Sequence, residues 1–203
     1  PFHRWLPGAM VAPTPVSALL HAVAVVKLGV FTILKVTVYT FGAGTLLQLD
    51  ASKVMQYAAA GTLLIAAVLA LRQDNIKRRL AYSTVSQLAY IVLAAALANR
   101  YALLAGGMHM LAHALAKITL FFCAGAILVS LHKTKVTELD GIGRTMPITL
   151  GAWVVASFAV IGLPLTGGFW SKWYLTQGAL EGGEPLLVAA VLLGSLLAMS
   201  YLL

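Results

Sequence analysis

The sequence carries little charge. Of its 203 residues, 10% are charged and 61% are hydrophobic, whereas a soluble domain usually has about 25% charged residues. A soluble protein with so many hydrophobic residues would need an unusually large apolar core to bury them. The composition therefore predicts a membrane protein.

Proline is also scarce where the chain is most apolar. The stretch from Val16 to Met146 contains none of the seven prolines, which suits a series of uninterrupted helices. The apolar runs are far longer than the ~10-residue alternating segments of a membrane β-barrel. We therefore expect an all-α fold, a polytopic transmembrane helix bundle.

Cysteine is almost absent. Cys123 stands alone in an apolar run, which excludes a disulfide framework and a cysteine-based metal site. The sequence also lacks a GxGxxG motif after a strand, the mark of dinucleotide binding. We expect no bound cofactor, no metal and no redox chemistry in this chain.

The acidic residues are few, and all six lie outside the apolar runs. The net charge of +8 would suggest nucleic acid in a soluble protein, but the basic residues lie mainly in short loops, so we expect no nucleic-acid partner. If the loops alternate between two sides, one side holds eight basic residues and the other only Lys53 and Arg100. The eight are Arg4, Arg72, Lys77, Arg78, Arg79, Lys133, Lys135 and Arg144. The positive-inside rule then places their loops in the cytoplasm.

The apolar runs are long enough to cross a bilayer, which takes about 20 residues. The six predicted spans cover approximately 16–42, 54–71, 80–97, 101–131, 147–180 and 185–203. The fifth is expected to break near 162–168, where glycine and proline cluster. The chain begins at Pro1 and ends inside an apolar run, so we expect 1–203 to be one transporter domain that is incomplete at both ends.

Four basic residues fall inside the predicted spans, and all are lysines: Lys27, Lys35, Lys117 and Lys172. A charge at membrane depth costs roughly 2.5–3.5 kcal/mol on insertion scales, so such residues usually serve a pathway. Lysine can lose its proton when desolvated, whereas arginine cannot, so buried lysines can load and release protons. The alternative is snorkelling to the headgroups, which is strongest for Lys35, near the end of its span.

Histidines accompany these lysines. His109, His113 and Lys117 are spaced i, i+4 and i+8, which places them on one helix face within about 12 Å. His21 lies in the run that carries Lys27. Histidine can pass a proton through either ring nitrogen, so the pattern indicates a proton relay. Metal or haem ligation and hydrogen-bonded packing histidines remain alternatives.

The break at GLPLTGGF is a further feature. Broken membrane helices line cavities, and their half-helix ends point partial charges at ions. Lys172 follows about one turn later, with Ser171 beside it as a possible hydrogen-bond partner. A simple packing kink is the alternative. Ser83, Thr84, Ser86 and Gln87 form a weaker polar patch, which could hold water or bond across helices.

Four ordered motifs resemble one known family. They are PFHRWLPGAMVAPTPVSALLHAVAVVK, IKRRLAYSTVSQLAY, HMLAHALAKITLFFCAGAI and GLPLTGGFWSKWYL. Together they are similar to the antiporter-like membrane subunits of respiratory complex I (NADH:quinone oxidoreductase) and of Mrp-type multisubunit cation/proton antiporters, and look closest to the Mrp D-type subunit.

The resemblance implies a fold of roughly fourteen helices with inverted repeats, of which this chain holds the end of the first broken helix and most of the second repeat. It implies that Lys27 connects two half-channels. Lys117, with His109 and His113, would be the centre of the second half-channel, and Lys172 its terminal residue. His21 would belong to the central polar axis.

These features predict a proton-translocating subunit of a complex I-like or Mrp-type complex. Its partners would be other membrane subunits, the lipid bilayer and protons, with sodium left open. We expect a multi-pass protein of a prokaryotic-type inner (plasma) membrane, and any oxidoreductase activity would belong to the complex. The alternatives are a non-conducting structural subunit that anchors redox partners and a haem- or quinone-binding redox subunit.

Overall fold

The computed structural model describes residues 5–19, 24–48 and 50–203, and in these ranges the regular structure is helical. The elements are α1 (Trp5–Gly8), η2 (Ala9–Val11), α2 (Thr14–Ala18), α3 (Val25–Lys35), η4 (Val36–Phe41), α4 (Ala43–Gln48), α5 (Asp50–Leu71), α6 (Ile76–Leu97), α7 (Arg100–Leu131), η5 (Val136–Glu138), α8 (Ile142–Thr145), α9 (Pro147–Ile161), α10 (Gly167–Glu181) and α11 (Pro185–Leu202).

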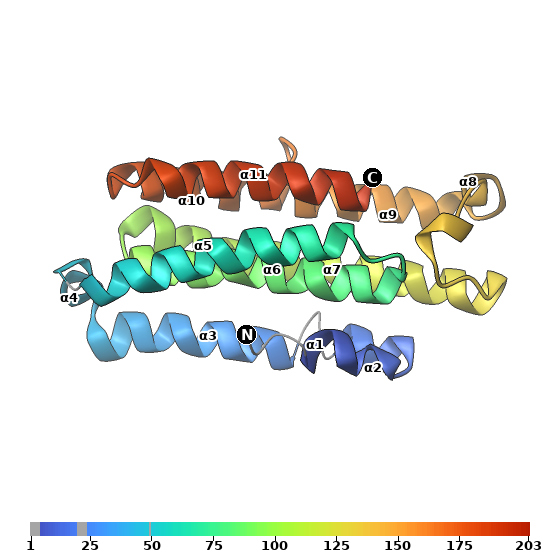
Figure 1. Ribbon diagram of the computed structural model, residues 1–203, viewed down its shortest axis with the longest axis horizontal. Coiled ribbons are helices and arrows are strands. Elements are labelled where there is room, and N and C mark those ends of the chain that lie inside the picture. The colour runs from blue at the N-terminus through green and yellow to red at the C-terminus, as the bar shows by residue number, and fades with distance from the viewer. Residues whose placement is uncertain (1–4, 20–23, 49) are drawn as a thin grey trace.

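The long helices run side by side along the long axis of the molecule, in three layers (Figure 1). One outer layer contains α1, α2 and α3, the middle layer α5, α6 and α7, and the other outer layer α9, α10 and α11. Helix α7 packs against elements of both outer layers, namely α2, α3, α9 and α10, and against α6 beside it. Its side chains therefore reach the interior of the bundle.

Four helices in the described part are long and apolar enough to cross a membrane: Ala51–Leu71, Ile76–Leu97, Arg100–Leu131 and Pro185–Leu202. Helix α9, Pro147–Ile161, is apolar but shorter. The expected all-α, multi-pass membrane fold is confirmed.

The first predicted span is not one helix. Helix α2 ends at Ala18 and α3 begins at Val25, after Ala24 in a non-helical conformation (φ −92°, ψ −85°). The wider turns of the π-helix η4 follow α3 and end at Gly42. The prediction of a continuous helix over 16–42 was wrong, since the described residue Ala24 is not helical; hydropathy carries no signal for such an interruption.

Side-chain caps set the starts of the two central helices. The Asn75 side chain accepts a hydrogen bond from the Arg78 backbone at 3.1 Å, and Asn99 accepts one from Ala102 at 2.9 Å. Asparagine is a preferred N-cap because its oxygen satisfies a free N–H of the first turn. Helix α6 consequently begins at Ile76, ahead of the expected 80, and the basic IKRR segment is helical.

Two loops at one end of the bundle are joined by a strap, which we define as residues 74–76 and 134–137. The Val136 N–H donates to the Asp74 carbonyl at 2.8 Å, and the Ile76 N–H donates to Thr134 at 3.0 Å. Asp74 also accepts from the backbone and the hydroxyl of Thr137, both at 3.2 Å. The α5–α6 and α7–α8 loops therefore lie on the same side.

Two contacts join loops at the opposite end. The Tyr57 hydroxyl donates to the Glu184 carboxylate at 2.5 Å, and Asn99 donates to the Gly178 carbonyl at 2.6 Å. These pairs place the α4–α5, α6–α7 and α10–α11 connections together. The alternation of loops inferred from the charges is thus present in the fold, while the assignment of one side to the cytoplasm stays a prediction.

Candidate functional site

Helix α7 presents the predicted histidine and lysine face to the interior. His109, His113 and Lys117 are 4%, 3% and 0% exposed. The two imidazole rings stack with their centroids 6.0 Å apart and their planes 7° apart. The i, i+4, i+8 spacing has therefore produced one buried polar face, continuous along two turns of the helix.

Lys117 lies at one end of this face and is held by α6. Its ammonium donates to the Ser83 hydroxyl at 2.7 Å and to the Leu80 carbonyl at 3.1 Å. Ser83 in turn donates to the hydroxyl of Tyr201, on α11, at 3.0 Å. Two hydroxyl groups thus extend the polar contact from Lys117 toward the end of α11.

His109, at the other end, is held by α10. Its Nδ1 atom lies 2.9 Å from the Ser171 hydroxyl, which donates to the Gly168 carbonyl at 2.9 Å. Since a serine hydroxyl has a single hydrogen, Ser171 accepts here and His109 donates through Nδ1. The expectation that Ser171 bonds Lys172 was wrong, because its hydroxyl turns toward α7 and its own helix start.

Lys172 is held by the break between α9 and α10. Its ammonium donates to the carbonyls of Val160 and Ile161, both at 2.8 Å, which are among the last carbonyls of α9 and unused within the helix. These oxygens carry the negative end of the helix dipole. The ammonium also lies 5.0 Å from the centre of the Tyr90 ring, within cation–π range.

The break itself depends on two glycines. Gly162 ends α9 with φ +88°, in the left-handed region that side chains disfavour. A Cβ on Gly168 would overlap the carbonyl oxygen of Ala159, so only glycine lets the start of α10 approach α9 this closely. Thr166 caps α10 by accepting from the Phe169 N–H at 3.3 Å. The break predicted near 162–168 is present.

Tyr90 lies between Lys172 and His109, and sequence reasoning did not single it out. The ring is 1% exposed, lies 5.3 Å from the His109 ring between centroids, and stands below the Lys172 ammonium. The buried row thus runs from Lys172 past Tyr90 to His109, His113 and Lys117, across helices α10, α6 and α7.

Lys27 lies on the buried face of α3, at 7% exposed. Its ammonium nitrogen has no hydrogen-bond partner among the described residues, and neither does either ring nitrogen of His113. Helix α3 packs against α6 and α7, so Lys27 lies on the buried side of α3 next to the two helices that carry most of the row. No described hydrogen bond joins it to the row.

Of the two remaining predicted residues, Lys35 is not part of this row. Lys35 is exposed, and its ammonium lies 5.4 Å from the centre of the Phe31 ring on its own helix. His21 lies outside the described residues.

The buried charged groups of the described interior are all basic. Among the described residues, the buried charged side chains are lysines, with no aspartate or glutamate beside them. Nor do three or more His, Cys, Asp or Glu side chains of the described part gather in a group that could hold a metal. The arrangement can hold and exchange protons on nitrogen and hydroxyl groups.

Known proteins share this sequence and fold. The family described as NADH:quinone oxidoreductase/Mrp antiporter, transmembrane, matches residues 1–198. NADH-quinone oxidoreductase subunit N of Desulforudis audaxviator is 39% identical over 203 residues, which are 99% of this chain and 40% of that protein. The chain thus spans well under half the length of this relative.

Two solved structures have the same fold. One is the membrane-bound sulfane sulfur reductase, an archaeal respiratory membrane complex (TM-score 0.86, 31% identity, 99% of this chain and 41% of that chain). The other is the Mrp complex from Dietzia (TM-score 0.88, 32% identity, 98% and 22%). The ordered motifs, the broken helix and these matches together show that the chain belongs to the antiporter-like membrane subunit family of NADH:quinone oxidoreductase and Mrp complexes.

Proposed function

We propose that this chain conducts protons through the membrane interior along Lys27, the His109–His113–Lys117 face and Lys172. A proton would pass between neighbouring nitrogens and hydroxyls by the loss of one N–H or O–H bond and the formation of the next. The lysines and histidines would alternate between charged and neutral states, each responding to the charge of its neighbours.

The observation that carries the proposal is the burial of several basic side chains in one interior row without a buried carboxylate among the described residues. Several like charges in a low-dielectric interior repel strongly, so the groups cannot all be protonated at once. A proton that arrives at one group therefore favours its release from another, which is the coupling that transport requires.

The unpartnered nitrogens of Lys27 and His113, and the amide of Gln87, also support this function. A buried polar group without a partner costs about 1–3 kcal/mol. Ordered water is the partner that satisfies such groups in protein interiors, and a chain of water molecules can also carry protons. Packing histidines alone would not leave both nitrogens of His113 without a partner among the described residues.

The chemistry of the row favours protons over sodium. Cation-selective pathways use rings of carboxylates or carbonyl oxygens, whereas the described row presents ammonium and imidazole groups. A resident positive charge would repel sodium, but the same groups accept protons when neutral.

We further propose that the chain acts within a larger complex in a prokaryotic inner membrane, together with other membrane subunits. The support is that its relative from Desulforudis and both solved structures are named as parts of respiratory or Mrp complexes. The closer similarity to the D-type subunit stays a prediction.

The experiment is proton flux in proteoliposomes containing the complex with the full-length subunit, comparing Lys117→Ala with the unaltered protein. Loss of flux with an assembled complex supports conduction through this chain. Unchanged flux would move the pathway to another subunit and favour the structural, non-conducting alternative. An absorption spectrum of the same preparation in visible light tests for haem.

A further inference from the structure

The hydrogen bonds of Lys117 lead out of the row as well as along it. Ser83 receives a bond from Lys117 and passes one to the Tyr201 hydroxyl. The neighbouring hydroxyls of α6 behave differently, because Thr84 donates to the Leu80 carbonyl and Ser86 to the Leu63 carbonyl. A backbone carbonyl cannot pass a proton on, whereas a hydroxyl both accepts and donates.

Tyr201 connects this pair to the end of the bundle. The residue is 2% exposed, and it lines a cavity of about 320 Å³ between the start of α6, the residues before α8, the start of α9 and the end of α11. Arg79, Asp140 and Trp153 also line this cavity, so it is partly polar. A cavity of this size and lining can hold water.

The cavity lies at the end of the bundle where the strap joins the two basic loops, and Val136 of the strap is among its lining residues. Arg79 donates to the Tyr201 backbone carbonyl at 3.1 Å, which fixes the end of α11 against the start of α6. By the distribution of basic residues, this is the side predicted to face the cytoplasm.

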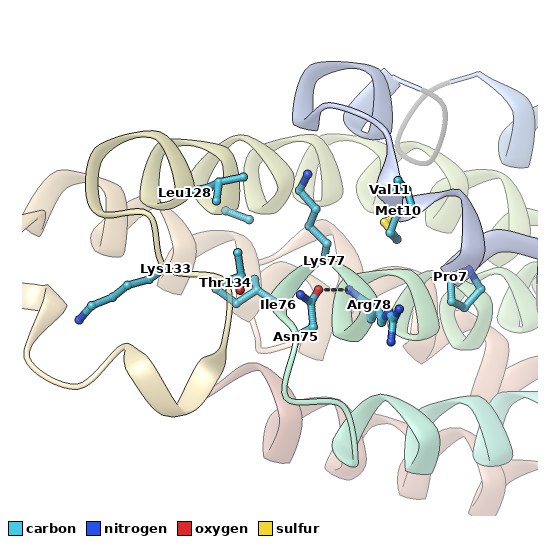
Figure 2. A pocket seen from close by; sticks show the side chains of 11 residues that line it. Pro7, Met10, Val11, Asn75, Ile76, Lys77, Arg78, Leu128, Lys133 and Thr134 are labelled. Atoms are coloured by element: carbon cyan, nitrogen blue, oxygen red, sulfur yellow. Dashed lines mark hydrogen bonds between the residues drawn. The ribbon is translucent and has the colours of Figure 1, made fainter.

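A second cavity at the same end makes a useful contrast. It has a volume of about 420 Å³ and lies between η2, the start of α6 and the end of α7. Figure 2 shows Lys77, Arg78 and Lys133 around it together with apolar Met10 and Leu128. Lys77 donates to the Ala12 carbonyl, and no described hydrogen bond leads from this lining to Lys117.

We propose that Ser83 and Tyr201 form a proton branch between Lys117 and water in the Arg79–Asp140 cavity. This proposal rests on the proposed function, since it gives the row an outlet at one face. In transfer from the row to the cavity, Lys117 loses an N–H proton to the Ser83 oxygen. Ser83 then releases its own proton to the Tyr201 oxygen, and Tyr201 releases its proton to a water molecule. Each hydroxyl gains one proton and loses one, so the net change is one proton moved from the ammonium to water.

The test uses three variants of the full-length subunit in its assembled complex: Lys117→Ala, Ser83→Ala and Tyr201→Phe. Tyr201→Phe keeps the ring and removes the single group that the branch needs, and it does not touch Lys117. Ser86→Ala is the matched control for Ser83→Ala, since it removes a buried hydroxyl one turn away. Tyr174→Phe is the control for Tyr201→Phe, because that ring stacks on Tyr101 instead.

We expect proton flux to fall at least about tenfold in Ser83→Ala and in Tyr201→Phe. This is less than the roughly hundredfold effect of losing a positioned proton-transfer group, because water can partly replace a missing hydroxyl. The Ser86→Ala and Tyr174→Phe controls should keep their flux. Ser83→Thr, which restores a hydroxyl, should regain most of the activity.

The outcomes separate the two proposals. Normal flux in Tyr201→Phe, with flux lost in Ser83→Ala and Lys117→Ala, would overturn the branch and leave Ser83 as a group that only positions Lys117. Normal flux in both hydroxyl variants with loss in Lys117→Ala would also overturn the branch while the proposed function stands. Normal flux in all three would remove both.

Discussion

Lys117 and Lys172 are two buried lysines of one row, yet different kinds of groups hold them. The Lys117 ammonium meets a serine hydroxyl and a carbonyl of the unbroken helix α6. The Lys172 ammonium meets two carbonyls at the end of the interrupted helix α9 and the face of an aromatic ring. Lys117 can exchange a proton directly with its hydroxyl partner, whereas the partners of Lys172 stabilise its charged form and take no proton from it.

The difference indicates a division of roles. Carbonyl oxygens at a helix C-terminus favour the protonated lysine, and a carbonyl cannot take the proton away. Lys172 is therefore suited to holding its proton for longer than Lys117 does, and to influencing His109 across Tyr90. Lys117, with a hydroxyl as its partner, is suited to passing protons. The variants below test this comparison.

The largest expected effect on proton flux comes from replacing Lys117 by arginine, and the matching change at Lys172 is the comparison. Lys117→Arg keeps the charge but cannot release a proton, so flux should fall by roughly a hundredfold or more, the scale of losing a proton-transfer group. Lys172→Arg should retain a measurable part of the flux. Both lysines are buried, so both variants have to accommodate a larger side chain in the interior. An equal loss of proton flux in the two variants would therefore contradict the division of roles.

The break that holds Lys172 can be disturbed without touching the lysine. Gly168→Ala places a methyl group against the Ala159 carbonyl and should destabilise the protein by about 1–3 kcal/mol, as overpacking does. The measurement is the thermal midpoint of the purified complex. Gly151→Ala is the control, since a Cβ there meets nothing within 4 Å, and an equal loss in that variant would argue against a special role for the break.

Removing the Ser171 hydroxyl, which lies between α7 and α10, should have a smaller effect on stability and on proton flux. Ser171→Ala removes the partner of His109 Nδ1 and should cost about 1 kcal/mol, together with a flux reduction of a few-fold because the imidazole is no longer oriented. Thermal stability and flux are measured together. Ser200→Ala serves as the control because that exposed hydroxyl bonds only within its own helix. Stability and flux both equal to the control would rule out a role for this contact.

The smallest effect on proton flux is expected from removing the side-chain cap of α10. Thr166→Ala removes the acceptor for the Phe169 N–H and should cost about 0.5–2 kcal/mol. Asn75→Ala removes the equivalent acceptor at α6, near Lys117. If Lys172 depends on the break and Lys117 does not, Thr166→Ala should lower proton flux more than Asn75→Ala does for the same loss of stability. Flux and thermal stability are measured for both variants.

Local sequence signals mark where several of the helices begin. Asn75 and Asn99 cap α6 and α7, and Pro147 and Pro185 begin α9 and α11. The burial of His109, His113 and Lys117 followed from one helical spacing. Such features depend on residues a few positions apart, so a single sequence contains them.

The contacts across helices could not be predicted in the same way. Tyr90 and Tyr201 lie in apolar runs that look like ordinary spans, and their roles depend on partners on other helices, Lys172 for Tyr90 and Ser83 for Tyr201. A tyrosine inside a predicted span is the one usable signal, because a buried hydroxyl needs a partner.

The strap between residues 74–76 and 134–137 has a mechanical consequence. It fastens the α5–α6 hairpin to the far end of α7 through backbone bonds and the Asp74 carboxylate, so these three helices form one rigid block at that face. Any rocking of the bundle during a transport cycle must then be absorbed elsewhere. The segment between α9 and α10, where the helix is already interrupted, lies outside this block, and a shift there would change the bonds of the Lys172 ammonium to the Val160 and Ile161 carbonyls.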